Sequence, residues 1–222
     1  MAAHWVRARR PMVRYDLDGA YRHYQPGDWF QANNQEIREL FARGTIDSTP
    51  QVLREEFGLQ GAGLLALGAS GPLPGLDAYG ISFQSASRRS LPWELTILWT
   101  PGAHLIATGA ALGLTRITAG SADIAWEMAV ALQSDSRTAG DVGSQDERDK
   151  TLALLGDLRL PLYDTGVVWV RKTPATEEVI QLWQEELDGG SDPTHAFLRT
   201  IYTHPVLLCT LPADWIGRWT WE

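Results

Sequence analysis

Hydrophobic and polar positions divide the chain into a short first part and a longer second part. In the first part, residues 13–17 alternate between apolar and polar side chains, and an Asp-Gly dipeptide separates them from a second strand pattern at residues 21–24. Such a dipeptide is typical of a tight hairpin turn. Residues 33–44 have apolar side chains at helical spacing between an asparagine and a glycine, which favour a helix start and a helix end. The pattern predicts a small α+β unit, a hairpin and a helix, over residues 12–50.

The second part alternates between strand and helix patterns. Residues 63–68 form a continuous apolar run between glycines, which is typical of a buried strand in a parallel sheet. The other predicted strands lie at residues 81–84, 95–99, 167–170 and 206–211, and the predicted helices at residues 146–155, 175–187 and 192–202. Residues 124–130 fit either a strand or a helix. We therefore predict an α/β domain over residues 60–222, with a mostly parallel central sheet, flanking helices, and residues 63–68, 95–99 and 167–170 as interior strands.

Composition and charge narrow the functions open to this chain. Its 222 residues are 44% hydrophobic, which is enough for one sizeable core. The formal charge of -8 argues against a wide surface that grips the phosphates of nucleic acid. Residues 1–11 are basic and lack the apolar segment of a secretory signal, so we interpret them as a flexible leader or as an arm that contacts an acidic partner.

The sequence also predicts the compartment. No apolar stretch approaches the ~18 residues that span a bilayer, so we expect no membrane partner. Cys209 is the sole cysteine and lies in an apolar run, which predicts a buried side chain and rules out an intrachain disulfide. We expect a cytoplasmic protein.

A glycine after two short polar residues is the feature most suggestive of a ligand site. Asp164-Thr165-Gly166 precedes an apolar strand and a Thr-Pro helix start, and glycine lets a ligand approach the backbone closely. This stretch resembles the GT-A-fold sugar-nucleotide glycosyltransferases, in which an Asn-Ser-Gly-like turn lies beside the donor sugar. The resemblance covers roughly residues 95–221. It implies that Asp164 is a catalytic carboxylate and that Thr165 and Gly166 bind donor hydroxyls. The alternative is a capped strand start that needs only the glycine.

Two parts of the resemblance concern carboxylates. The strand at residues 95–99 resembles the one that carries the family's metal-binding Asp-x-Asp, but Thr100-Pro101-Gly102 follows it here. Without two carboxylates no divalent ion is fixed there, so the sequence predicts metal-free binding of the donor beside Thr100 and Gly102. Asp123 and Glu127 resemble the acidic start of the next strand and are further catalytic candidates. Alternatively, Asp123 caps an element and Glu127 faces solvent.

Without a metal, the donor diphosphate needs arginines. Arg137 and Arg148 lie in the insertion-like stretch 133–150, and a guanidinium can clamp a phosphate with two hydrogen bonds. Asp192 stands one step before the family's Asp-Gln position and is predicted to cap a helix, with His195 exposed in its first turn or acting as a base. The tryptophan-rich end at residues 211–221 resembles the family's closing segment, as a sugar platform or a strap on the core.

These observations support two functions. The first is a glycosyltransferase-like enzyme that transfers a sugar from a nucleotide-sugar donor to a protein or a modified nucleic-acid base, without the usual metal. The alternative is a catalytically degenerate binding module, or a virion structural or assembly module of the same fold. Residues 12–50 resemble N-terminal pieces of tailed-phage proteins, which implies a phage-encoded protein in the host cytoplasm. The sugar, the nucleotide and the acceptor stay open.

Overall fold

The structure is a computed structural model that describes residues 3–47, 61–68, 71–100, 102–119 and 130–211. Its first part contains a three-stranded antiparallel sheet with the strand order β4, β1, β5. The strands are β1 (Ala3–Ala8), β4 (Trp29–Asn33) and β5 (Ile46–Asp47). Residues 3–8 are therefore a central strand, and the expectation of a flexible leader is wrong. Its side chains alternate between the two faces of the sheet: Val6 and Ala8 are buried in the core, whereas Trp5 and Arg7 are exposed.

The predicted hairpin and helix are confirmed. Strands β2 (Met12–Tyr15) and β3 (Tyr21–Tyr24) pair antiparallel. Helix α1 (Asn34–Ala42) begins at the Asn33 cap, whose side chain accepts from the Glu36 N–H while the Glu36 carboxylate accepts from the Asn33 N–H. This reciprocal pair satisfies two backbone donors that the helix itself leaves open.

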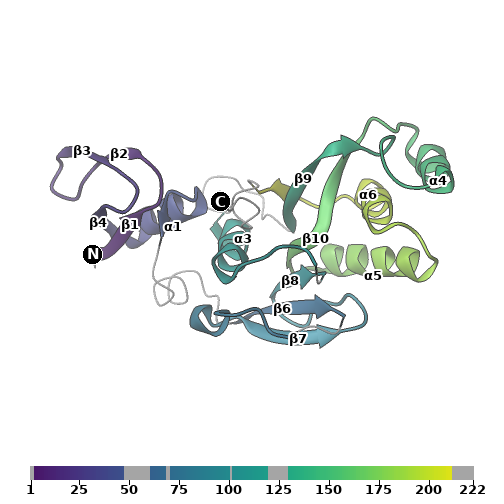
Figure 1. Cartoon of the computed structure of the whole chain (residues 1–222), viewed down its shortest axis with the longest axis horizontal. Coiled ribbons are helices and arrows are strands. Elements are labelled where there is room, and N and C mark those ends of the chain that lie inside the picture. Colours follow the sequence, from purple (N-terminus) through teal and green to yellow (C-terminus); the bar gives the residue numbers. More distant parts are fainter. Residues whose placement is uncertain (1–2, 48–60, 69–70, 101, 120–129, 212–222) are drawn as a thin grey trace.

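In the described part of the chain, six strands form the main sheet, in the order β11, β9, β10, β8, β6, β7 (Figure 1). Their bounds are β6 (Ala62–Leu67), β7 (Ser82–Ala86), β8 (Leu95–Trp99), β9 (Val130–Thr138), β10 (Pro161–Arg171) and β11 (Leu208–Thr210). Only β10 is antiparallel to its two neighbours, and the other three neighbouring pairs are parallel. The predicted mostly parallel α/β sheet and its three interior strands, now β6, β8 and β10, are confirmed.

Helices cover both faces of this sheet (Figure 1). They are α3 (Ala107–Ala119) on one face, α5 (Pro174–Asp188) and α6 (Pro193–Thr203) on the other, α4 (Gln145–Leu155) beside α6, and a 3₁₀ turn η2 (Asp77–Tyr79). Successive side chains of β10 point to opposite faces of the sheet. Val167 and Trp169 pack with α3, whereas Val168 and Val170 pack with α5 and α6.

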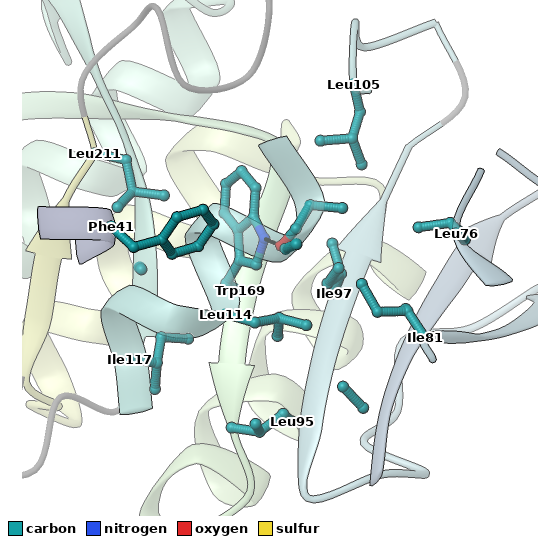
Figure 2. Packing of buried hydrophobic residues seen from close by; sticks show 14 of the residues in the cluster. Phe41, Leu76, Ile81, Leu95, Ile97, Leu105, Leu114, Ile117, Trp169 and Leu211 are labelled. Atoms are coloured by element: carbon teal, nitrogen blue, oxygen red, sulfur yellow. Dashed lines mark hydrogen bonds between the residues drawn. The ribbon is translucent and has the colours of Figure 1, made fainter. Parts of the chain in front are cut away.

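Trp169 is the centre of the α3 face. Its indole N–H donates to the carbonyl of Ala110 at 2.9 Å, and a Cβ on Gly113 would lie 2.2 Å from the ring. Phe41 of α1 belongs to the same buried cluster, together with Ile117 and Leu211 (Figure 2). The N-terminal unit thus contributes to one continuous core with the helix that covers the main sheet.

Two further expectations concern burial and membranes. Cys209 is buried on β11, as predicted. Among the described residues, no helix is both long and apolar enough to cross a bilayer.

Candidate functional site

The reversed direction of β10 brings two predicted site segments together at one edge of the sheet. Strands β6, β8 and β9 are parallel and end at this edge, whereas β10 begins there. The segment after β8 therefore meets the first half of β10. The Thr100 N–H donates to the Gly166 carbonyl at 2.8 Å. This edge of parallel strands is the usual place for a ligand in an open α/β sheet.

Residues 164–166 form an irregularity inside β10, and the expectation of a turn before the strand is corrected. Asp164 pairs with Gln133 and Val168 pairs with Leu132, so the stretch from Asp164 to Val168 spans a single step of β9. The Asp164 carboxylate compensates locally, because its Oδ1 accepts from the Gly166 N–H at 2.9 Å. Short polar side chains can bind backbone N–H groups where a strand loses its regular pairing with its neighbour, and they stabilise such irregularities.

The glycine at position 166 has a packing reason. A Cβ there would lie 2.7 Å from the Cβ of Ala103 and 3.1 Å from Asp164 Oδ1. The turn that carries Ala103 is held by two hydrogen bonds, from the Ala103 N–H to the Thr100 carbonyl and from the Trp99 indole N–H to the Ala103 carbonyl. Gly102, at φ 103°, supplies the left-handed residue of this turn. The group that approaches Gly166 closely is therefore the Ala103 side chain, and the Gly166 N–H donates to the Asp164 carboxylate.

Arg137 lies on β9 and not in an insertion, which corrects the sequence interpretation of residues 133–150. Its Nε and Nη2 donate to the Asp135 carboxylate at 3.0 and 2.7 Å. The hydrogen bond from Arg137 holds the pKa of Asp135 below its ordinary value. The Asp135 hydrogen bond and charge raise the pKa of Arg137, with further contributions from the charges of Asp164 and Asp141. Arg137 thus lies within electrostatic reach of Asp164.

The structure brings together five of the predicted site residues at this edge, Thr100, Gly102, Asp164, Thr165 and Gly166, with Arg137 within electrostatic reach of Asp164 farther along β9. Thr100, Asp164 and Thr165 are half-buried. Within the described residues, the hydroxyls of Thr100 and Thr165 make no hydrogen bond, which leaves both able to bind a ligand.

The remaining candidates lie elsewhere. Arg148 is on α4, and its guanidinium donates to the Gly143 carbonyl and to Gln145, so its partners are local to the start of that helix. Asp123, Glu127 and residues 212–221 lie outside the described residues. In the part of the chain that the structure describes, no group of three or more His, Cys, Asp or Glu side chains could hold a metal.

His195 is buried, and its predicted exposure is wrong. Asp192 caps α6 as predicted, accepting from the N–H groups of Thr194 and His195. The imidazole Nε2 lies 3.2 Å from the Val142 carbonyl, and Nδ1 lies 2.9 Å from the Thr151 hydroxyl. A carbonyl can only accept, so we assign a proton to Nε2. The α4 segment that covers this ring explains its burial.

Sequence reasoning missed the ion-pair network beside His195. Arg199 is buried and donates to Glu147 at 3.0 Å, to the Thr151 hydroxyl at 2.9 Å and to both oxygens of Glu186. Burial lowers the pKa of Arg199, but the hydrogen bonds and charges of Glu186 and Glu147 outweigh it and raise the pKa. The network joins α4, α5 and α6. Its members are far apart in sequence, so no local sequence pattern predicts the network.

Comparison of the chain with protein-family models, with curated proteins and with solved structures finds no match.

Proposed function

We propose that the edge formed by Thr100, Gly102, Ala103 and residues 164–166 binds a nucleotide sugar. The observation that carries the proposal is the contact between these two segments, made by the Thr100–Gly166 hydrogen bond and the packing of Ala103 on Gly166. The resemblance to GT-A glycosyltransferases names the same two segments as neighbours of the donor. The mostly parallel sheet that supports them is the fold class that this resemblance implies.

The side chains at this edge supply chemistry for both ends of such a ligand. Asp164 and the hydroxyls of Thr100 and Thr165 suit sugar hydroxyls, because carboxylates accept and hydroxyls both donate and accept. Arg137 suits the diphosphate. Its Nε and Nη2 bind Asp135, while Nη1 makes no hydrogen bond within the described residues. Donor binding would therefore require no divalent ion.

In the proposed reaction the protein transfers the sugar to a hydroxyl or amino group of a protein or a modified nucleic-acid base. Asp164 is the catalytic carboxylate in this proposal, acting as the base for the acceptor. Arg137 would stabilise charge on the departing nucleoside diphosphate.

A catalytically degenerate binding module is the second candidate. It is favoured by the absence of carboxylates at Thr100-Pro101-Gly102 and by the use of Asp164 Oδ1 in an internal hydrogen bond. Release of nucleoside diphosphate from a nucleotide sugar distinguishes the two. The enzyme releases it in the presence of an acceptor, whereas the binding module binds without turnover.

The test is calorimetric titration with a panel of nucleotide sugars in EDTA. We expect saturable binding to wild type and weaker binding to Asp164→Asn, which keeps an acceptor for the Gly166 N–H but removes the charge. The matched control is Asp157→Asn, because the Asp157 carboxylate likewise accepts from a backbone N–H two residues on, that of Arg159, and lies outside the site. Absence of binding across the panel, with and without Mn²⁺, would refute the proposal.

A further inference from the structure

Arg89 is a partly buried cation that forms no ion pair with any residue that the structure describes. It lies between β7 and β8, on the segment that runs along α5, where its backbone N–H donates to Gln184 Oε1 at 2.9 Å. Its guanidinium stacks on the buried Trp183 ring, with 4.1 Å between the guanidinium carbon and the ring centroid. Its Nε is buried and has no hydrogen-bond partner. No carboxylate of the described residues pairs with it.

Other arginines near this helix are paired, which makes Arg89 an exception. Its sequence neighbour Arg88 forms an ion pair with Asp188. The more deeply buried Arg199 binds both Glu147 and Glu186. For Arg89, burial alone lowers the pKa to about 10, so the group stays charged at neutral pH. Buried charges in proteins are ordinarily paired, because an unpaired one loses its hydration without compensation.

This guanidinium lines a pocket of about 530 Å³ between residues 88–91 and α5. The volume is in the range of small-molecule sites. Leu91 and Ile180 supply apolar wall, Ser90 a hydroxyl, and Gln181 and Glu185 acceptor oxygens. None of the residues that line this pocket belongs to the edge at Thr100, Gly102, Ala103 and residues 164–166.

We propose that this pocket binds a small carboxylate that also carries an apolar side chain and an amino group, as an apolar amino acid does. The carboxylate supplies the anion that Arg89 lacks, through the fork of Nη donors that suits planar carboxylates. Leu91 and Ile180 receive the apolar side chain. Glu185 has its Oε1 bound by the Gln181 amide at 2.9 Å and no cation beside it among the described residues, so it accepts from the ligand's ammonium group. The same carboxylate disfavours a doubly charged phosphate.

The test uses L-leucine as the probe, the full chain labelled with ¹⁵N, and the indole N–H resonance of Trp183 as the readout. We expect a saturable shift with L-leucine. With L-leucinamide, which lacks the carboxylate, and with inorganic phosphate, we expect at least about 10-fold weaker binding, the effect of losing one charge-assisted hydrogen bond of about 1.4 kcal/mol or more. Sodium chloride at equal ionic strength should give no saturable shift.

Two variants and one control locate the site. Arg89→Gln should weaken L-leucine binding at least about 10-fold, and Arg89→Lys, which keeps the charge but loses the fork, should weaken it as well. Arg159→Gln changes an exposed arginine paired with Asp157 and should bind L-leucine as wild type does. If Arg89→Gln does not fold, Arg89→Lys decides. Equal responses to L-leucine and L-leucinamide, tighter binding of phosphate, or wild-type affinity in the folded Arg89 variants would overturn the proposal.

Discussion

Replacing Arg199 with methionine tests the buried network that joins α4, α5 and α6. Methionine has a similar length and no charge, so the main loss is electrostatic. The substitution removes the hydrogen bonds to Glu147, to Thr151 and to Glu186. The Glu147 side chain is only 8% exposed and, among the described residues, keeps one cationic partner, Lys150, at 3.3 Å.

The magnitude follows from the loss of the buried guanidinium, since the remaining partner of Glu147, Lys150, is largely exposed. Removing one partner of a buried ion pair leaves an uncompensated charge and costs about 3–5 kcal/mol. We therefore expect Arg199→Met to lower the free energy of unfolding by about 3–5 kcal/mol at neutral pH, a large part of the ~5–15 kcal/mol typical of a folded protein. The matched control is Arg88→Met. It breaks the Arg88–Asp188 pair, whose side chains are 65% and 50% exposed, and should cost about 1 kcal/mol or less.

The difference in the free energy of unfolding between wild type and Arg199→Met should depend on pH, and this dependence identifies Glu147 as the group responsible. In wild type, burial raises the pKa of Glu147, but Arg199 and Lys150 outweigh it and hold the pKa below its ordinary value of 4.5. Ionised Glu147 therefore contributes stability above about pH 4.5, and this is lost as the pH falls through the folded-state pKa. Without Arg199, the pKa of Glu147 rises from its wild-type position, because the lowering effect of the guanidinium is gone, so protonation of Glu147 costs the variant less than it costs wild type. The stability gap should narrow on acidification.

Urea unfolding followed by circular dichroism at neutral and mildly acidic pH measures this gap. Adding Glu147→Gln to Arg199→Met should recover part of the lost stability, because it removes the buried carboxylate that has lost its arginine. A loss of less than about 1 kcal/mol in Arg199→Met, or a gap that does not change with pH, would refute the assignment of this network as a buried ionic connection.

Three further predictions concern single sites. Gly166→Ala should lower the free energy of unfolding by about 1–3 kcal/mol, because its Cβ would lie 2.7 Å from the Ala103 Cβ. The control Gly71→Ala, with open space around the added Cβ, should cost little, and equal melting temperatures of the two variants would contradict this. Asn33→Ala should lower stability by about 1 kcal/mol in urea unfolding through loss of the α1 cap, and no change would show the cap to be dispensable. Nucleotide-sugar binding should persist in EDTA in calorimetry, and binding that is abolished by EDTA and restored by Mn²⁺ would contradict metal-free binding.

The sheet was predictable where each strand has a strong apolar signal of its own. Residues 63–68 and 95–99 are almost wholly apolar, and burial on both faces of a sheet requires that pattern. Strand β9 was missed because its second half, Gln133–Thr138, is polar and extends past the covered part of the sheet. Strand β1 was missed because Arg7, with Arg9 and Arg10 just after the strand, gave the segment the composition of a basic leader.

The site was predictable only in part, because its geometry depends on contacts between segments distant in sequence. The sequence singled out Asp164 and Gly166, but the partner that approaches Gly166 is Ala103. Likewise, the position of His195 at a helix start favours exposure, and only the packing of α4 over α6 buries it. Local propensities carry no information on such tertiary contacts.

The most direct test of the proposed function is to map a nucleotide sugar onto the backbone by NMR. Amide resonances of Thr100, Gly102, Thr165 and Gly166 should shift in a saturable way during titration with the best ligand of the calorimetric panel, while those of the β2–β3 hairpin stay fixed. Shifts of the Gly166 amide should be much smaller in Asp164→Asn at the same ligand concentration. Saturable binding that leaves all four of these amides unperturbed would contradict the site assignment.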